Sequence, residues 1–342
     1  MERATIRDLK TDAFMGREVI DTYAVRKIEL KTVAADGKSG AAGKQYLSLE
    51  LGDATGRIDG VMWDNVEAAS REVAPGDVVK IKGTVGKYRD NPQVKVELMA
   101  KLAPGDYVTA HFLAASAVPR PDLEAGVRVE MASVAAPQLV KLLKSFYDDT
   151  EFMRAFLDAP AAKLWHHAWT GGLAEHTLGV CRLARAAQKN YDLLDADLLI
   201  TGCLLHDIGK IREFKLSTFI DYSDEGRLVG HLVLGDQMLM EKVNKIRDFP
   251  DELQKRLRHI VLSHHGEKER GSPVVPATLE ALIVHHCDYM DAHAAAFTRI
   301  IKREGLQNKR WSDYVNLIDR YIYLANIDDD RKAENDGNLK LF

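Results

Sequence analysis

The sequence predicts two domains of different class, an all-β barrel at the N-terminus followed by an all-α helical bundle. Between about residues 17 and 102, short segments of alternating, β-branched residues are separated by Gly and Asp. After about residue 135, apolar residues recur at intervals of three and four, as in amphipathic helices. Histidine divides in the same way, since 11 of the 12 lie at or beyond His166 and the other is His111. A chain of 342 residues is long enough for two such cores.

The first part contains five predicted strands and one helix. We expect strands at residues 19–30, 45–51, 57–63, 78–88 and 93–98, with the helix at 65–73 between the third and fourth. Five strands with a helix in that position are the arrangement of an OB-fold, a small barrel that often binds single strands. Residues 49–63 and 83–88 resemble the OB-fold family of nucleic-acid binders.

Single-strand binding requires aromatic platforms and positive charge. The barrel offers both in seven candidate nucleic-acid-binding residues: Tyr23, Arg57, Trp63, Lys82, Lys87, Tyr88 and Arg89. Residues 1–104 hold 17 Lys and Arg against 16 Asp and Glu, so binding would depend on a local stripe of charge. The alternative for each residue is an aromatic ring in the core or a charge on a solvated face.

The expected domain boundaries follow these patterns. Residues 1–16 form an N-terminal segment, 17–103 the barrel, 104–134 a linker, 135–327 the helical domain and 328–342 a polar tail. The linker holds Pro104, Pro119 and Pro121, and we expect no helix across residues 119–122. A short helix is expected around residues 110–117.

The second part is predicted to be helical throughout. Apolar periodicity indicates helices at residues 137–147, 151–157, 176–191, 196–206, 232–247, 251–265, 277–304 and 311–325. A hairpin-like excursion at 219–230 leads to His231. The apolar segment 317–324 is either the last helix of the core or a surface between subunits of a homo-oligomer.

The composition indicates the cellular setting of the protein. No apolar run approaches the roughly 20 residues of a membrane span, and the N-terminus lacks the apolar core of a signal peptide. Cys181, Cys203 and Cys287 have no CxxC spacing, so a reduced, cytoplasmic setting without a membrane is expected.

The pair His206-Asp207, followed by Gly209-Lys210, is the strongest functional signal. Other candidate ligands surround it at helix-length spacings: His176, His231, His264, His265 and Asp288. Five imidazoles and two carboxylates are enough for two metal ions if one carboxylate bridges them. Both adjacent pairs lie at the predicted end of a helix, where the backbone can turn neighbouring side chains toward one point.

In this order the seven residues resemble the HD superfamily of metal-dependent phosphohydrolases, in its two-metal form. The resemblance implies that His176, His206, Asp207 and Asp288 hold one divalent ion, and that Asp207, His231, His264 and His265 hold the other. Two ions sharing Asp207 would activate a bridging hydroxide for attack on a phosphodiester. Such ligands suit Mn, Fe, Co, Ni or Zn.

Several residues near these ligands are candidates for catalysis or support. We expect Lys210 to stabilise charge on the phosphoryl group, although a lysine at a helix end is often merely solvated. His166 and His167 are expected to contact phosphate or to protonate the leaving group. His285 and Asp291 lie three residues either side of Asp288 and are candidate partners of the ligands.

The OB-fold and the HD residues together resemble the YhaM-type bacterial exoribonucleases, over roughly residues 17–325. The resemblance implies Mn-dependent removal of nucleotides from the 3′ end of single-stranded RNA, and of DNA as a second substrate. The sequence differs at one position from the cyclic-dinucleotide hydrolases that share the His-Asp pair followed by Gly-Lys. Those enzymes have a Glu four residues before the first His ligand, where this chain has Gly172.

Two alternatives remain open at this point. One is a phosphohydrolase of small nucleotides, such as cyclic dinucleotides or nucleoside phosphates, in which the barrel serves regulation or oligomerisation. The other is a nucleic-acid-binding protein whose metal site is structural.

Overall fold

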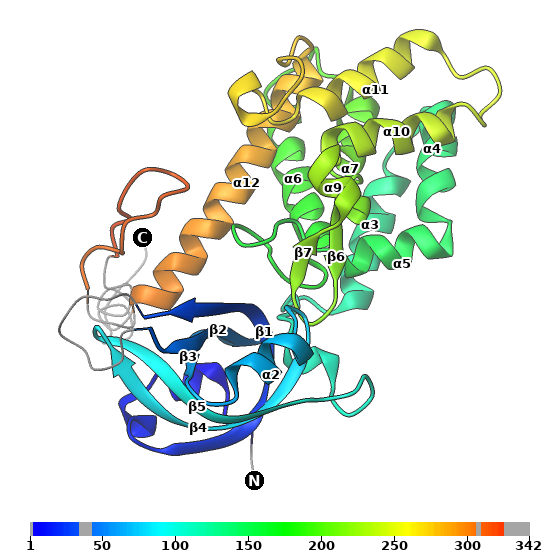
Figure 1. The fold of residues 1–342 in the computed structure, drawn as a ribbon. Coiled ribbons are helices and arrows are strands. Elements are labelled where there is room, and N and C mark those ends of the chain that lie inside the picture. The colour runs from blue at the N-terminus through cyan, green and yellow to red at the C-terminus, as the bar shows by residue number, and fades with distance from the viewer. Residues whose placement is uncertain (1–2, 34–42, 306–308, 325–342) are drawn as a thin grey trace.

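The fold consists of a closed β-barrel and a larger helical domain, joined along one long helix (Figure 1). The computed structural model describes residues 3–33, 43–305 and 309–324. The predicted fold class, an all-β barrel followed by an all-α domain, is confirmed. The predicted polar tail, residues 328–342, lies outside the described residues.

The barrel has five strands, which appear in the order β1-β2-β3-β5-β4 around the closed sheet. All neighbours are antiparallel except β3 and β5, and helix α2 (Val66–Glu72) connects β3 to β4. This is the topology of an OB-fold. The strands are β1 (Glu18–Thr32), β2 (Gln45–Asp53), β3 (Gly56–Met62), β4 (Val78–Tyr88) and β5 (Asn91–Lys101).

The N-terminal segment folds onto the barrel instead of standing apart. Helix α1 (Ile6–Leu9) buries Ile6 and Leu9 completely in the barrel core, which also contains Leu51 and Ile81. The backbone N–H of Ile6 donates to the buried Asp53 carboxylate, at 2.9 Å, at the end of β2. These contacts tie α1 to the β2–β3 turn.

The predicted linker contains a helix that belongs to the helical domain. Helix α3 (Arg120–Ala132) begins after Pro119 and carries Pro121 in its first turn, so the expectation of no helix there is wrong. A proline in the first turn is tolerated, because its missing N–H would have no intrahelical partner. Leu123 and Val127 are buried in the helical core. The short helix expected at 110–117 is only a 3-10 turn at Thr109–His111.

The remaining helices surround a single apolar core. They are α4 (Pro137–Tyr147), α5 (Thr150–Asp158), α6 (Gly172–Gln188), α7 (Ala196–Leu205), α8 (Lys210–Glu213), α9 (Asp224–Leu228), α10 (His231–Val243), α11 (Asp251–Ser263) and α12 (Leu279–Glu304). The predicted excursion before α10 is a two-stranded hairpin, β6 (Phe214–Leu216) and β7 (Ile220–Tyr222), followed by α9. The three cysteines are buried free thiols.

The β6–β7 hairpin docks the helical domain on the barrel. The guanidinium of Arg26 on β1 donates to the backbone oxygens of Thr218, at 2.5 Å, and Phe112, at 2.6 Å. In return the hydroxyl of Thr218 donates to the backbone oxygen of Gly76, at 2.7 Å. Because these bonds join backbone groups of both domains, they set how the barrel sits beside α12.

The helix predicted at 311–325 is wrong for its described part. Residues 309–324 form a loop with isolated bridges between Trp311 and Tyr323 and between Val315 and Arg320. Ile322 and Leu324 pack on Ile300 near the end of α12. The apolar residues are therefore spaced to cover α12 and not to form one face of a helix. No described helix is long and apolar enough to cross a membrane.

Candidate metal centre

The structure brings all seven predicted ligands together from three helices and the C-terminal ends of two others. His176 lies in the first turns of α6, His206 and Asp207 follow α7, His231 begins α10, His264 and His265 follow α11, and Asp288 lies on α12. Their ligand atoms form two groups, each with all its atoms within 4.8 Å of one another: His176, His206, Asp207 and Asp288 in one, and His231, His264 and His265 in the other.

Asp207 lies between the two groups and points one oxygen at each. Its Oδ2 is 3.4 Å from Nε2 of His176 and 3.3 Å from Nε2 of His206. Its Oδ1 is 3.7 Å from Nε2 of His231 and 3.3 Å from Nε2 of His264. A carboxylate in this position can contribute one oxygen to each of two neighbouring cations.

Every one of the five imidazoles is held through Nδ1. Nδ1 of His176 lies 2.7 Å from the Asp291 carboxylate, and Nδ1 of His231 lies 2.9 Å from that of Glu213. In the other three, Nδ1 lies 2.7 to 3.0 Å from a backbone oxygen of Cys203, Val261 or Arg270. Donation from Nδ1 leaves the Nε2 lone pair available as a metal ligand, and these partners fix the orientation of each ring.

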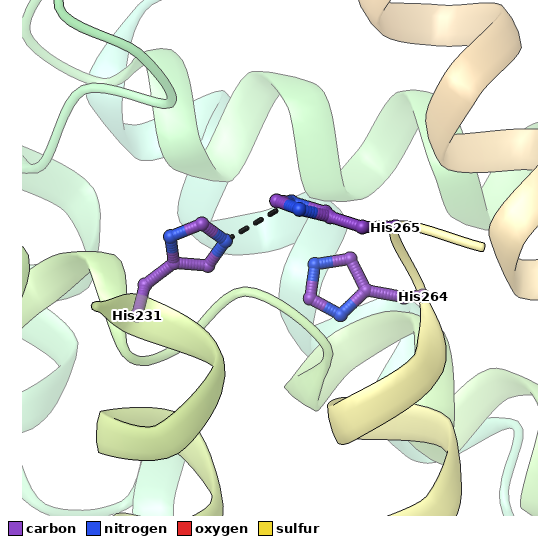
Figure 2. Close-up of side chains that lie close together, drawn as sticks. All are labelled: His231, His264 and His265. Carbon is purple, nitrogen blue, oxygen red and sulfur yellow. Dashed lines mark hydrogen bonds between the residues drawn. The ribbon is translucent and has the colours of Figure 1, made fainter. Parts of the chain in front are cut away.

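Nε2 atoms of these imidazoles lie so close together that a cation between them would be favourable. Nε2 of His231 lies 3.1 Å from Nε2 of His265, and Figure 2 shows these rings converging with that of His264. Among the described residues, the buried Nε2 of His264 and Oδ1 of Asp207 have no hydrogen-bond partner. Lone pairs directed at one buried point are unfavourable unless positive charge lies between them. The residues present therefore fit two divalent ions.

Glycines allow the helix ends to come this close. A Cβ on Gly209, two residues after Asp207, would lie 2.0 Å from the backbone oxygen of His231. Only glycine lets α8 touch the start of α10 at that point. Gly266, after the second histidine pair, has a φ of 81° and carries the ring of His285 against its Cα. Its left-handed backbone ends α11 and turns His264 and His265 inward.

Packing also requires a glycine at position 172. A Cβ there would lie 1.9 Å from the backbone oxygen of His167, whose own φ is 43°. The strained His166-His167 turn therefore occupies the space where a side chain at position 172 would begin. A carboxylate at this position, as in the cyclic-dinucleotide hydrolases, is excluded by the path of the backbone.

Neighbouring charges and burial shift the pKa values of the ligands in the two groups. Burial opposes ionisation of Asp207, but Lys210 and His206 outweigh it and hold the pKa of Asp207 well below its usual range. Burial lowers the pKa of His231 and His264, and burial together with His264 lowers that of His265 to about 4. A lowered pKa favours the neutral form of each of these three rings, which is the form that binds metals. Burial also disfavours the charged form of His176, yet Asp207 and Asp288 raise its pKa.

Lys210 is buried beside the bridging carboxylate. Its Nζ lies 2.6 Å from Oδ2 of Asp207, and the side chain is only 7% exposed. A lysine at a helix end that was merely solvated would not be enclosed in this way. The ammonium is thus held beside the carboxylate that lies between the two ligand groups.

The two neighbouring histidines have different surroundings. Both ring nitrogens of His166 are buried without a hydrogen-bond partner among the described residues, and its ring centroid is 5.0 Å from that of His176. By contrast, Nε2 of His167 lies 3.0 Å from the Asp291 carboxylate that also holds His176. Nδ1 of His285 lies 2.8 Å from the backbone oxygen of His264. Asp291 and His285 therefore support the candidate ligands.

Glu213 was missed by the sequence-based prediction. It is buried, and its Oε1 contacts both Nδ1 and the backbone nitrogen of His231. It lies 18 residues from His231, so no helical spacing connects the two. The available signal was its place three residues after Lys210, in the short helix α8.

The seven candidate nucleic-acid-binding residues of the barrel are scattered. Tyr23 is fully buried and its hydroxyl donates to the backbone oxygen of Ala4, so it cannot stack on a base and the prediction for it is wrong. The ring of Trp63 packs against that of Tyr46 in a tilted arrangement, with 4.9 Å between the ring centroids. Tyr88 is exposed at the tip of the β4–β5 hairpin, under Arg89. The other three are in surface ion pairs: Arg57 with Glu50, Lys82 with Glu18 and Lys87 with Asp12.

Barrel and site together define the class, an OB-fold barrel joined to an HD-type metal-dependent phosphohydrolase domain. A model of the HD domain matches residues 173–293, and a model of an OB-fold nucleic acid binding domain matches residues 31–102. The 3'-5' exoribonuclease YhaM of Listeria welshimeri is 32% identical over 293 residues, which are 83% of this chain and 88% of that protein. Its counterpart in Bacillus subtilis is 31% identical over 84% of this chain and 88% of that protein. The chain belongs to the YhaM family.

Proposed function

We propose that this protein is a metal-dependent 3′→5′ exoribonuclease that hydrolyses phosphodiester bonds of single-stranded RNA. The observation that carries the proposal is the pair of ligand groups joined by Asp207, in a chain whose relatives are named 3'-5' exoribonucleases. The OB-fold barrel supplies the expectation of a nucleic-acid substrate.

The ligand roles follow from the two groups. His176, His206, Asp207 and Asp288 would hold one ion, and His231, His264 and His265 would hold the other with Asp207 as the bridge. Two divalent ions bound there supply water activation and neutralise charge on the phosphoryl group. Mixed imidazole and carboxylate ligands favour a borderline divalent metal, for which we propose Mn over Fe, Co, Ni or Zn.

Two further side chains of this chain would act on the substrate. The ammonium of Lys210 is placed to hold negative charge on a non-bridging phosphate oxygen, and the bond to Asp207 keeps it in position. His166 has both ring nitrogens available and is placed to bond the phosphate or the leaving oxygen. His167 would position the site through Asp291 and not touch the substrate itself.

The setting of the reaction is also a proposal. Single-stranded RNA is the proposed substrate and single-stranded DNA a second one, with Trp63, Tyr88 and Arg89 on the barrel as aromatic and basic contacts. A cytoplasmic location agrees with three buried free thiols. Exposed Leu317 and Tyr321 on the 309–324 segment are candidates for contact between subunits of a homo-oligomer.

Hydrolysis of small nucleotides is the less favoured alternative. The family relationship does not favour it, and the backbone of His167 leaves no room at Gly172 for the third-metal carboxylate of the cyclic-dinucleotide hydrolases. A structural role for the metals would not account for the enclosed ammonium of Lys210 beside Asp207 or for the unpartnered ring nitrogens of His166.

The test is incubation of metal-stripped protein plus Mn with single-stranded RNA labelled at its 5′ end. We expect a ladder that shortens from the 3′ end, and loss of at least 10³-fold in rate for Asp207→Asn, in line with the several kcal/mol a metal pair contributes. Asp192→Asn, an exposed aspartate on the same domain, is the matched control. Intact RNA with the wild-type protein would overturn the proposal, and hydrolysis of cyclic dinucleotides would then be measured.

A further inference from the structure

A deep cleft separates the barrel from the lower half of α12. Its volume is about 1290 Å³. One wall is formed by α1 and the β2–β3 turn of the barrel, and the other by α12 from Ala295 to Arg303. Figure 1 shows α12 running from the helical domain down to the barrel, so that its C-terminal end lies beside the barrel.

The lining of the cleft is strongly basic, whereas the chain as a whole is not. Its lining includes two acidic residues, Asp53 and Glu175, and eight Lys or Arg side chains: Arg7, Lys10, Arg26, Arg57, Lys163, Arg299, Lys302 and Arg303. The whole chain carries a net charge of −4. Positive charge is therefore gathered at this one concavity from both domains, which is the electrostatic signature of a polyanion site.

Several of these cations are left without an acidic partner. Among the described residues, no carboxylate oxygen lies within 4.0 Å of the charged nitrogens of Arg7, Lys10 or Lys302. Burial, together with the nearby Arg303, lowers the pKa of Lys10. Cations of the barrel and of α12 thus face each other across the cleft. Arg57, Lys163 and Arg303 do have acidic partners, in Glu50, Asp221 and Glu304. The other cations repel one another, and an anion bound between them would reduce that repulsion.

One face of α12 runs from the metal centre to the cleft. Asp288, Asp291, Ala295, Thr298 and Lys302 follow one another at intervals of three or four residues, which places them on the same side of the helix. At 1.5 Å per residue, the distance from Asp288 to Lys302 is about 21 Å. One stripe of the helix therefore leads from a metal ligand to the basic walls.

The inner end of the cleft carries an aromatic ring beside the site. Trp169 and His167 line it, and the indole N–H of Trp169 donates to Glu175 at 2.9 Å. His167 is joined through Asp291 to His176. Aromatic rings at one end and cations at the other are the two components that single-strand sites combine.

We propose that this interdomain cleft binds the sugar-phosphate backbone of the single strand whose 3′ end occupies the metal centre, with Lys10 of the barrel and Lys302 of α12 as phosphate contacts. The inference rests on the proposed nuclease function. It places the strand between the domains, in addition to the contacts proposed for Tyr88 and Arg89 at the hairpin tip of the barrel.

Salt dependence of binding tests the cleft without relying on cleavage. With a chelator present to prevent hydrolysis, the affinity for a 5′-fluorescein-labelled 12-nucleotide RNA is measured by anisotropy over a range of salt concentrations. Each lost phosphate contact lowers the slope of log K against log salt by about 0.7 for single strands. Lys10→Gln and Lys302→Gln should each reduce the slope by that amount, equally for oligo-A and oligo-U.

Lys141→Gln is the matched control, since Lys141 is an exposed lysine on α4 outside the cleft. It should keep the wild-type slope. A double Lys10→Glu/Lys302→Glu variant should also lower the ratio of 12-nucleotide RNA hydrolysis to dinucleotide hydrolysis at least ten-fold. Thermal melting confirms that each variant is folded, as expected for surface lysines.

The outcomes separate the two proposals. Slopes equal to that of the wild type in both Gln variants would overturn the proposal that the cleft binds the strand, even if the protein degrades RNA. Reduced slopes in the Gln variants, together with a wild-type protein that never shortens RNA, would support the cleft as a polyanion site and overturn the nuclease. A loss of slope confined to variants of Tyr88 and Arg89 would place the strand on the barrel tip and contradict the cleft.

Discussion

Glu213 and His231 are joined through a single carboxylate oxygen, which lies 2.9 Å from Nδ1 of the imidazole and 3.2 Å from the backbone nitrogen of the same residue. One buried oxygen thus orients the ring and also satisfies an N–H at the start of α10. Since the other ring nitrogen faces Asp207, Glu213 controls the direction of a candidate metal ligand.

Loss of Glu213 should therefore weaken metal binding. We expect Glu213→Ala to raise the Mn concentration for half-maximal activity by roughly 10- to 100-fold, and Glu213→Gln, which keeps an acceptor oxygen, to raise it less. Metal binding by equilibrium dialysis should move in parallel. Glu225→Ala, an exposed glutamate on α9, is the control. An unchanged Mn requirement in Glu213→Ala would show that His231 is oriented without it.

Metal addition should stabilise the helical domain. Mn at about 100 times its Kd adds about 2.7 kcal/mol to the free energy of unfolding, because only the folded state assembles both groups. This corresponds to a rise in Tm of roughly 5 to 10 °C, measured by scanning calorimetry of stripped and reloaded protein. Asp207→Asn should abolish most of the rise. An equal rise in that variant would mean that the stabilising metal binds elsewhere.

Gly172 should not tolerate a side chain. Its helical backbone would accept alanine, but the added Cβ would lie 1.9 Å from the oxygen of His167. We expect Gly172→Ala to lower the free energy of unfolding by about 1 to 3 kcal/mol and to reduce RNA hydrolysis by displacing His166. Gly305→Ala, where nothing lies within 4 Å of the new Cβ, should be neutral in both measurements. Equal behaviour of the two variants would argue against the tight turn.

Asp149 should make stability depend on pH. It caps α5 by accepting from the backbone N–H groups of Glu151 and Phe152; these bonds and Lys242 lower its pKa. A lowered pKa stabilises the fold above the unfolded value of about 3.9, and the contribution is lost as pH falls through the folded value. Asp149→Ala should cost about 1 kcal/mol at pH 7, by urea unfolding, and the difference from wild type should shrink below pH 4. A constant difference down to pH 2 would contradict the cap.

Local patterns predicted most of the fold. Strand β4 and helix α4 begin and end at the predicted residues, because alternation and three- to four-residue periodicity are properties of neighbouring side chains. The same rules failed where packing on another element decided the outcome. Periodic apolar residues after Trp311 cover α12 instead of forming a helix. Helix α3 includes Pro121 in its first turn because the apolar face of this helix packs in the helical core.

For the candidate site, too, some features were visible in the sequence and others were not. Adjacent pairs at helix ends, with a glycine beyond, were visible in the order of residues, and the structure brings the seven side chains together. The burial of Tyr23 was not visible, because a strand residue's exposure depends on what covers the barrel end, here the segment carrying Ala4 and α1.

By itself, the sequence determined the order of strands and helices and the residues able to bind metal, since both are encoded in short stretches of chain. Only the tertiary structure decided that each oxygen of Asp207 faces a different group, that Glu213 and Asp291 hold the rings, and that Lys10 and Lys302 face one cleft. These relationships join residues far apart in the chain, and their geometry exists only once burial of both cores has brought the helices and the barrel together.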